Sequence, residues 1–281
     1  MNPCPFSATA SSHSWPISPR EREIAALRRE VRTIEGAGQS WDEPPLTTGC
    51  RELDNLFAEK GLRRGSLIEW LSAEPGGGAW SLSLFIACQM ARQSPSGGRD
   101  GAVAMLAEHN DFYPLAALAW GADPQRLILI HTRHRADRLW ALDQCLRCPA
   151  VAAVWAAVDA IDPHTFRRLQ LAAEEGGVIG LLVRDARVRD EPSWSHAQLL
   201  VRPLGGPRQP ERVRERTSNG RRLQVELLRS RHGVAGQTVE LTLDDVRRSL
   251  SQAEVPHQSK TPITNIFHHP RSLARRPIAY R

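Results

Sequence analysis

A glycine-rich segment between an apolar run and a predicted helix is the part of this sequence whose residue types could do chemistry. The segment EPGGGAWS covers residues 74–81, the apolar run before it covers 66–72, and a helix is predicted over 79–93. Its central residues are Gly76, Gly77, Gly78, Ala79, Trp80 and Ser81. Glycines in this setting expose backbone N–H groups, and the start of a helix favours negative charge. The arrangement is therefore typical of a loop that binds nucleotide phosphates.

Two side chains that such a loop needs are missing. After its last glycine, a phosphate-binding loop carries Lys and then Ser or Thr, which neutralise the β- and γ-phosphates and bind Mg²⁺. Here Ala79 and Trp80 hold these positions, and Ser81 follows one residue late. Each missing charge-assisted contact weakens binding by about 1.5–3 kcal/mol, and catalysis suffers more because phosphoryl transfer depends on the same charges. We therefore predict no cofactor and no ATPase activity at this degenerate loop.

The elements that must position the loop alternate between strands and helices. The predicted strands are 67–71, 102–107, 126–130, 151–157 and 178–183. The predicted helices are 79–93, 112–120, 136–148 and 163–175. Strands that are apolar throughout are typical of a parallel sheet with helices on both faces. Beyond residue 184 the pattern changes, and three further strands are predicted at 197–202, 222–230 and 239–243. The last two alternate apolar and polar residues, so we expect an antiparallel extension with one solvent-exposed face.

The sequence thus predicts an α/β fold with a mainly parallel sheet, C-terminal antiparallel strands and a separate N-terminal helix. The single domain is expected over 44–250, and 1–17 have the composition of a disordered segment. The separate helix, 18–36, begins with a capping box and ends at a glycine. Its apolar residues form one narrow stripe: Ile24, Leu27, Val31 and Ile34. We expect this stripe to pack either on the chain's own domain or on another subunit or partner.

The last residues, 251–281, are predicted to form a basic disordered tail. They carry five Lys and Arg residues against Glu254 alone. Within them lies an apolar cluster: Ile263, Ile266 and Phe267. This composition suits a short motif that folds on a partner, and the alternative is a tail without a binding role.

The composition as a whole favours a cytoplasmic protein and leaves association with the nucleoid open. Five scattered cysteines suit a reducing compartment, and no stretch reaches the roughly 18 uncharged apolar residues of a membrane span. We predict no secretory signal, because the N-terminus lacks a basic start and a long apolar run. The net charge is +6, and eight arginines face three glutamates between 207 and 232. Such a segment suits nucleic-acid phosphates or acidic proteins, or else reflects only a GC-rich genome.

One close pair of cysteines, Cys145 and Cys148, lies near the end of a predicted helix. A zinc site would need two more ligands, and the nearest candidates are His131 and His134. We favour buried helix cysteines over a metal site.

The order of elements and several short phrases together resemble the RecA family over about 20–245. The phrases are LTTGCRELDNLFAEKGLRRGSLIEWL, AVAMLAEHNDFYP and RRLQVELLRSRHGVAGQTVELTL. The resemblance implies that Glu108 corresponds to the glutamate that activates the attacking water. It also implies that the strand 151–157 should end in a metal-holding aspartate, where this chain has Ala157 and places Asp159 in the turn beyond.

A closer resemblance is to the ImuA branch of that family, which is grouped with SulA-like division inhibitors. It is carried by HTFRRLQLAAEEGGVIGLLVR and QVELLRSRHGVAGQTVEL. ImuA proteins are accessory factors of damage-inducible mutagenesis in bacteria, so the resemblance implies a non-catalytic role in error-prone translesion DNA synthesis in the SOS response. The implied partners are an ImuB-like inactive Y-family polymerase, a damage-inducible replicative-type polymerase and RecA. A homo-oligomer is a further expectation.

Two other functions stay open from the sequence. A RecA-class ATPase with an unorthodox loop would need another cation, and Lys60, Arg63 and Arg64 are the nearest in sequence. A SulA-like division inhibitor is the second alternative, although those inhibitors are shorter and lack the basic N-terminal helix.

The loops that grip DNA in RecA are short in this chain. After the fifth strand only 184–195 remains before the next strand. Candidate contacts to single-stranded DNA, by phosphate pairing and base stacking, are Arg184, Arg187, Arg189 and Trp194, with Arg214 and Arg216 from the arginine-rich segment. The alternative is a short surface loop with a packed tryptophan.

Overall fold

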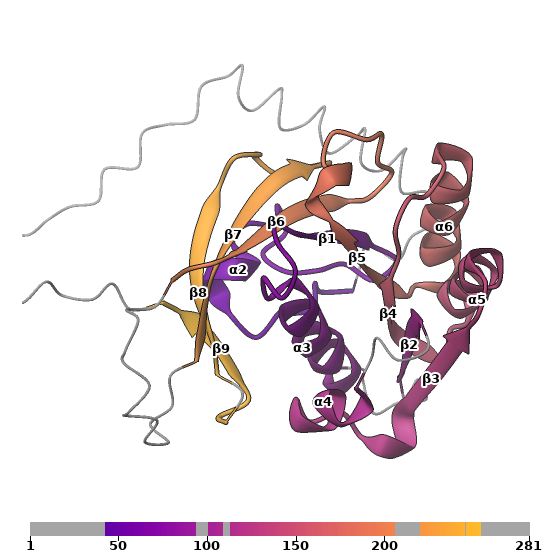
Figure 1. Cartoon of the computed structure of the whole chain (residues 1–281), viewed down its shortest axis with the longest axis horizontal. Coiled ribbons are helices and arrows are strands. Elements are labelled where there is room, and N and C mark those ends of the chain that lie inside the picture. The colour runs from indigo at the N-terminus through magenta and orange to yellow at the C-terminus, as the bar shows by residue number, and fades with distance from the viewer. Residues whose placement is uncertain (1–42, 94–100, 109–112, 206–219, 245, 254–281) are drawn as a thin grey trace, which may run out of the picture.

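Nine strands form one sheet in this computed structural model, which describes residues 43–93, 101–108, 113–205, 220–244 and 246–253. The strands are β1 Leu67–Ser72, β2 Ala102–Glu108, β3 Leu127–Thr132, β4 Val151–Ala157, β5 Ile179–Asp185, β6 Ala197–Pro203, β7 Arg221–Ser230, β8 Thr238–Asp244 and β9 Ser249–Gln252. The helices are α2 Arg51–Asp54, α3 Ala79–Arg92, α4 Pro114–Ala119, α5 Arg135–Arg147 and α6 Pro163–Gly176, with 3₁₀ turns η1 Pro124–Arg126 and η2 Ala186–Val188. Across the sheet the order is β3-β2-β4-β5-β1-β6-β7-β8-β9 (Figure 1).

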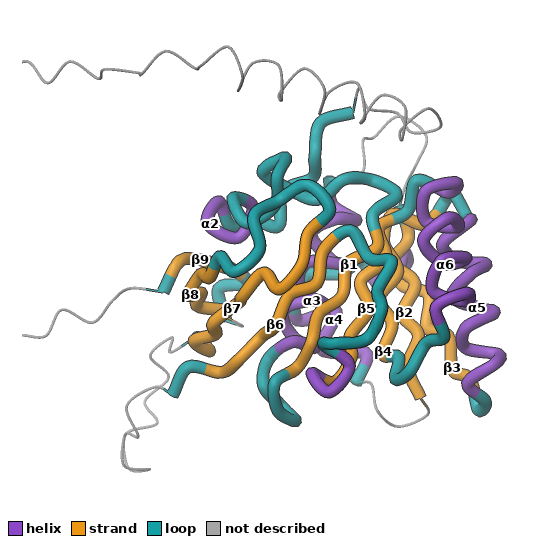
Figure 2. Tube along the Cα trace, turned by 90° about the horizontal axis from the view of Figure 1, so that it is seen from above, coloured by secondary structure: helices purple, strands orange, loops and turns teal. Residues whose placement is uncertain are grey.

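The sheet has a parallel part and an antiparallel part. Strands from β3 to β6 in this order pair in parallel, whereas β6, β7, β8 and β9 pair antiparallel. Helices α3 and α4 contribute to the apolar core on one face, and the neighbouring helices α5 and α6 to the core on the other (Figure 2). The predicted α/β class, with helices on both faces and antiparallel strands at the C-terminal end, is confirmed.

Local signals in the sequence place α6 as predicted. The Asp162 side chain accepts a hydrogen bond from the backbone N–H of Thr165 (2.9 Å), and Pro163 opens the helix. At the other end Gly177 adopts a left-handed conformation, with φ of 65°, that favours glycine. Because β4 ends at Ala157 and α6 starts at residue 163, no long loop follows the fourth strand.

One strand was missed by the sequence analysis. Strand β9 pairs antiparallel with β8 and extends to Gln252, so the predicted domain end at 250 is too early. The segment SLSQ has only four residues, and Leu250 is the one that is buried. A single buried residue gives no alternation of apolar and polar side chains from which a strand could be predicted.

Several predictions concern residues that the structure does not describe. They are the segment 1–17, the helix 18–36 with its stripe, the tail from residue 254 onward with Ile263, Ile266 and Phe267, and the candidates Arg214 and Arg216. Within the described ranges, every helix is too short or too polar to cross a membrane.

His196 fastens the start of β6 to the start of β1. Its backbone N–H donates to the carbonyl of Leu67 (2.7 Å), and its Nδ1 accepts from the Leu67 N–H (3.2 Å). Burial, helped by Arg231 and His232, lowers the pKa of the imidazole from 6.5 to about 3. The Glu174 carboxylate, 3.8 Å from Nε2, acts in the opposite direction, and burial outweighs it.

We predict that the protein loses stability as the pH falls from 6.5 toward 3, because in that window the unfolded chain protonates residue 196 and the folded protein does not. The group should remove about 1.4 kcal/mol of unfolding free energy per pH unit. Urea unfolding at pH 7.5 and pH 5.0 measures this in the natural protein and in His196→Gln. The loss between the two pH values should be about 2 kcal/mol smaller in the variant. Equal losses would contradict the assignment.

Candidate functional site

The glycine-rich loop lies between β1 and α3, at the edge of the sheet where the parallel strands end. Gly76 and Gly78 adopt left-handed conformations, with φ of 73° and 95°. A Cβ on Gly78 would lie 2.4 Å from a methyl carbon of Leu223, so the loop packs closely on β7. The backbone N–H of Gly77 and the hydroxyl of Ser72 both donate to the carbonyl of Glu74 (2.9 and 2.7 Å). The glycines therefore serve the packing of the loop itself, without any nucleotide.

Trp80 lies between the first turn of α3 and strand β4. Its ring packs edge-on against Trp155, with centroids 5.2 Å apart and planes at 69°, and the side chain stays 37% exposed. Trp155 donates from Nε1 to Ser83 Oγ (2.8 Å), and Ser83 Oγ donates to the carbonyl of Ala79 (2.7 Å). Ala79 itself is fully buried. The position of the lysine in a phosphate-binding loop is thus held by a buried alanine, and the position of the metal-binding hydroxyl by an indole that packs against Trp155 of β4.

The end of β4 carries a guanidinium where a metal-holding carboxylate is expected. Ala157 is the last residue of β4, and Asp159 is exposed in the turn beyond it, as predicted. Arg138, a buried residue of α5, donates to the carbonyl of Ala157 and to the hydroxyl of Thr132 (3.4 Å each). A guanidinium therefore lies at the strand end where the RecA resemblance implies a carboxylate. Glu108 ends β2 at the same edge, in register with Thr132.

The cations proposed from the sequence for an unorthodox loop are at the opposite edge, so that hypothesis is wrong on this point. Lys60, Arg63 and Arg64 precede β1, whose six residues separate them from the loop by about 20 Å. Arg63 pairs with Glu59, and Arg64 pairs with Glu43 (3.0 Å).

A different cation reaches the loop, and the sequence analysis missed it. Arg221, the first residue of β7, donates from Nη1 to the hydroxyl of Ser81 (3.2 Å). The two residues are 140 positions apart, so only the pairing of β7 beside β6 brings them together. The one available signal was the start of the predicted hairpin at 222, next to this arginine.

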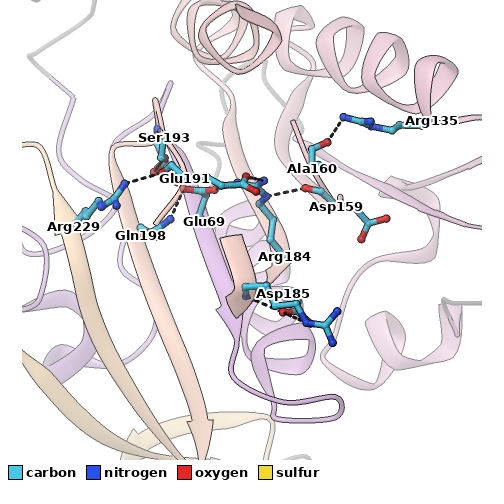
Figure 3. Close-up of polar contacts among 12 residues, drawn as sticks. Glu69, Arg135, Asp159, Ala160, Arg184, Asp185, Glu191, Ser193, Gln198 and Arg229 are labelled. Atoms are coloured by element: carbon cyan, nitrogen blue, oxygen red, sulfur yellow. Dashed lines mark hydrogen bonds and ion pairs between the residues drawn. The ribbon is translucent and has the colours of Figure 1, made fainter. Parts of the chain in front are cut away.

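Arg184, predicted to contact DNA, is instead buried in the sheet. Its side chain is 1% exposed and pairs with the fully buried Glu69 of β1 (2.6 Å). Its other nitrogens donate to Glu191 (3.0 Å) and to the carbonyl of Asp159 (2.9 Å) (Figure 3). The prediction is corrected because every side of this guanidinium is engaged inside the protein.

The segment after β5 is tied down by the same carboxylate. We call residues 186–196 the strap. Glu69 Oε2 accepts from the hydroxyls of Ser193 (2.5 Å) and Ser195 (3.1 Å) of the strap and from Nε2 of Gln198 on β6 (3.1 Å). Arg229 of β7 donates to the carbonyl of Glu191 (2.9 Å) (Figure 3). The strap therefore lies across the sheet as a fixed element.

Comparison with known proteins fits this geometry. The RadB recombinase, known from a crystal structure, is similar with a TM-score of 0.54 and 16% identity over 74% of this chain and 100% of its own. That likeness shows the fold alone, a RecA-like core. Protein ImuA from two strains of Caulobacter vibrioides is 28% identical over 211 residues, which cover 71% of this chain and 84% of the relative. The resemblance to the ImuA family is confirmed. No family model matches the chain.

The remaining DNA candidates of this ImuA-like chain lie on or near the strap. Arg187 is 91% exposed but pairs with Asp185 (3.6 Å), and the exposed Arg189 pairs with Asp190 (3.5 Å). Trp194 is partly exposed, and the guanidinium of Arg167 lies over its ring at 4.8 Å. Each of these three side chains already contacts another residue of the protein: the two arginines pair with neighbouring aspartates, and the tryptophan packs under Arg167. Their contact with DNA stays a prediction.

The cysteine pair does not match the predicted buried pair. Cys145 is half-buried, and burial raises the pKa of its thiol, whereas Cys148 is exposed beyond the end of α5. Among the described residues, no three His, Cys, Asp or Glu side chains are grouped closely enough to hold a metal ion.

We predict that Arg184→Met lowers the free energy of unfolding by about 3–5 kcal/mol, because it leaves the Glu69 carboxylate buried without a counter-charge. Arg187→Met is the matched control: it removes an exposed arginine from the neighbouring strap and should change stability by less than about 0.5 kcal/mol. Urea unfolding measures both. Similar stabilities for the two variants would show that the buried pair has no such role.

Proposed function

We propose that this chain is a non-catalytic accessory protein of error-prone translesion DNA synthesis in the SOS response, and that it acts in the cytoplasm. It acts through an ImuB-like inactive Y-family polymerase, a damage-inducible replicative-type polymerase and RecA. Single-stranded DNA and further copies of the chain are additional ligands in this proposal. The likeness to ImuA over 71% of the chain supports the family role.

The position of Trp80 carries the non-catalytic part of the proposal. Phosphoryl transfer needs a lysine on the phosphates, a metal ion and a carboxylate that orients its water shell. In this chain an indole packs against β4, and a guanidinium lies at the end of that strand. Among the described side chains, Arg221 adds a positive charge at the loop through its hydrogen bond to Ser81. A bound triphosphate would thus lack the loop lysine, and at the end of β4 it would meet a guanidinium in place of a metal-holding carboxylate.

Calorimetry with ATP should give no Mg²⁺-dependent binding for the natural protein, at a detection limit of about 1 mM in Kd. The variant Ala79→Lys should behave in the same way, because Trp80 still replaces the metal-binding hydroxyl and β4 still ends in Ala157. Ala136→Lys, an added lysine at an exposed alanine of α5, is the control for non-specific attraction. Micromolar, Mg²⁺-dependent binding, or DNA-stimulated phosphate release that Glu108→Gln abolishes, would instead favour the ATPase hypothesis.

The edge strand β3 supports a role in protein binding. It ends the described sheet and pairs there with β2 only. Ile128 and Leu129 are both exposed although they point to opposite faces, and Trp140 of the neighbouring α5 is exposed as well. An apolar edge strand without charged or proline residues, which the described part of the chain pairs on one side, is a template for an added strand of a partner. We assign this edge as a contact surface for the polymerase or RecA partners.

Ile128→Lys should weaken binding of purified ImuB-like polymerase or RecA at least tenfold, about 1.4 kcal/mol, because it places a charge in the contact. Leu171→Lys is the matched control, since Leu171 on α6 is exposed to 43% and Ile128 to 45%. Both variants should melt like the natural protein. If Ile128→Lys binds each partner as well as Leu171→Lys does, the edge is not the contact surface.

A further inference from the structure

A small apolar hollow lies at the edge of the sheet opposite the glycine-rich loop. It encloses about 60 Å³, several times what one water molecule needs. Buried side chains of Phe57, Leu62, Ile68 and Ala197 contribute to its lining, and the exposed Ala58 and His232 stand at its rim. Ile68 and Ala197 are partners in the β1–β6 register, and both line the hollow. The hollow has room for one branched apolar side chain.

The chain enters its described part beside this hollow. Leu46 forms two backbone hydrogen bonds with Leu62, a lining residue (2.8 Å each). Glu43, the first described residue, pairs with Arg64, which lies in sequence between the lining residues Arg63 and Ser66 (3.0 Å). The 42 residues that precede Glu43 are therefore attached to the body next to the hollow. The other end of the described chain, Ala253, follows β9 at the far edge of the sheet.

The segment before Glu43 carries an apolar stripe that needs cover. Ile24, Leu27, Val31 and Ile34 recur at spacings of three and four. Helices in water gain most of their stability from packing such a face rather than from propensity, so the stripe is a poor candidate for a helix that stands alone. Nine residues from Ile34 to Glu43 can span up to about 30 Å, enough to bring the stripe back to the body.

The stripe is more readily bound by the hollow of its own chain than by another molecule, because the two are covalently linked. A flexible linker of the length between the predicted helix and Glu43 has a root-mean-square end-to-end distance of about 15 Å, which corresponds to an effective concentration in the millimolar range. A second copy of the chain at micromolar concentration competes at a disadvantage of about a thousandfold. We propose that the hollow is the docking site for an apolar side chain of the stripe from the same chain. The proposal does not rest on the translesion role.

Docking in the same chain would make the stripe a covered surface in the free monomer. A partner that binds the stripe must then displace it from the hollow, which lowers the partner's apparent affinity. In the free protein the stripe would thus be unavailable to partners until it is displaced.

Hydrogen exchange of the full chain, followed by mass spectrometry, tests the proposal. Amides of residues 20–35 should exchange at least tenfold more slowly in the natural protein than in Ala58→Asp, in which a charge stands at the rim of the hollow. Ala58 is exposed, so this variant should fold, and unchanged exchange in the strands verifies that it does. Ala136→Asp, a charge at an exposed alanine of α5, is the matched control and should keep the protection.

Each outcome decides the proposal. Protection that is independent of protein concentration between 1 and 50 µM, and that only Ala58→Asp removes, supports docking in the same chain. Protection that grows with concentration would mean that a second copy supplies the stripe, and it would overturn the proposal. Exchange as fast as in an unstructured peptide would overturn it as well. So would protection that Ala58→Asp leaves intact, because the stripe would then pack elsewhere.

Discussion

The carboxylate of Glu69 is the constraint on which the arrangement around the glycine-rich loop depends. It lies in the middle of β1, the strand that leads into the loop, and it is fully buried. A buried carboxylate is stable only when it is paired and its oxygens are hydrogen-bonded. Arg184 supplies the charge, and the strap supplies two hydroxyl donors. The segment after β5 must therefore turn back over the sheet, and it is not free to form a long loop at the strand ends.

The same carboxylate links the parallel sheet to its antiparallel extension. Gln198 of β6 donates to it, in register beside Glu69, and β6 then pairs with β7. Strand β7 brings Leu223 against Gly78 and Arg221 to Ser81. Contacts within the protein thus hold the loop, and the two tryptophans fix the helix that follows.

The fold could be predicted from the sequence to a large extent because its signals are local. Continuous apolar runs gave strands such as β4 with the predicted bounds, and an aspartate, a proline and a glycine gave the ends of α6. The predicted replacement of the loop lysine needed no structure at all. Arg184 could not be placed in this way, since its burial depends on a residue 115 positions earlier. A lone acid inside an apolar strand was the available signal, because such a group requires a buried cation. Arg221 had no local signal of its function.

The edge-on contact between Trp80 and Trp155 makes residue 80 part of the core packing between α3 and β4. The indole contributes to packing between α3 and β4, so its replacement by a small hydroxyl residue removes apolar contact before any phosphate can bind. A lysine at residue 79 would have to enter a position that is now fully buried, and a carboxylate at residue 157 would lie beside Arg138. Residues 79, 80 and 157 are thus coupled through the packing of α3 on β4, so a single substitution at any one of them also disturbs the core.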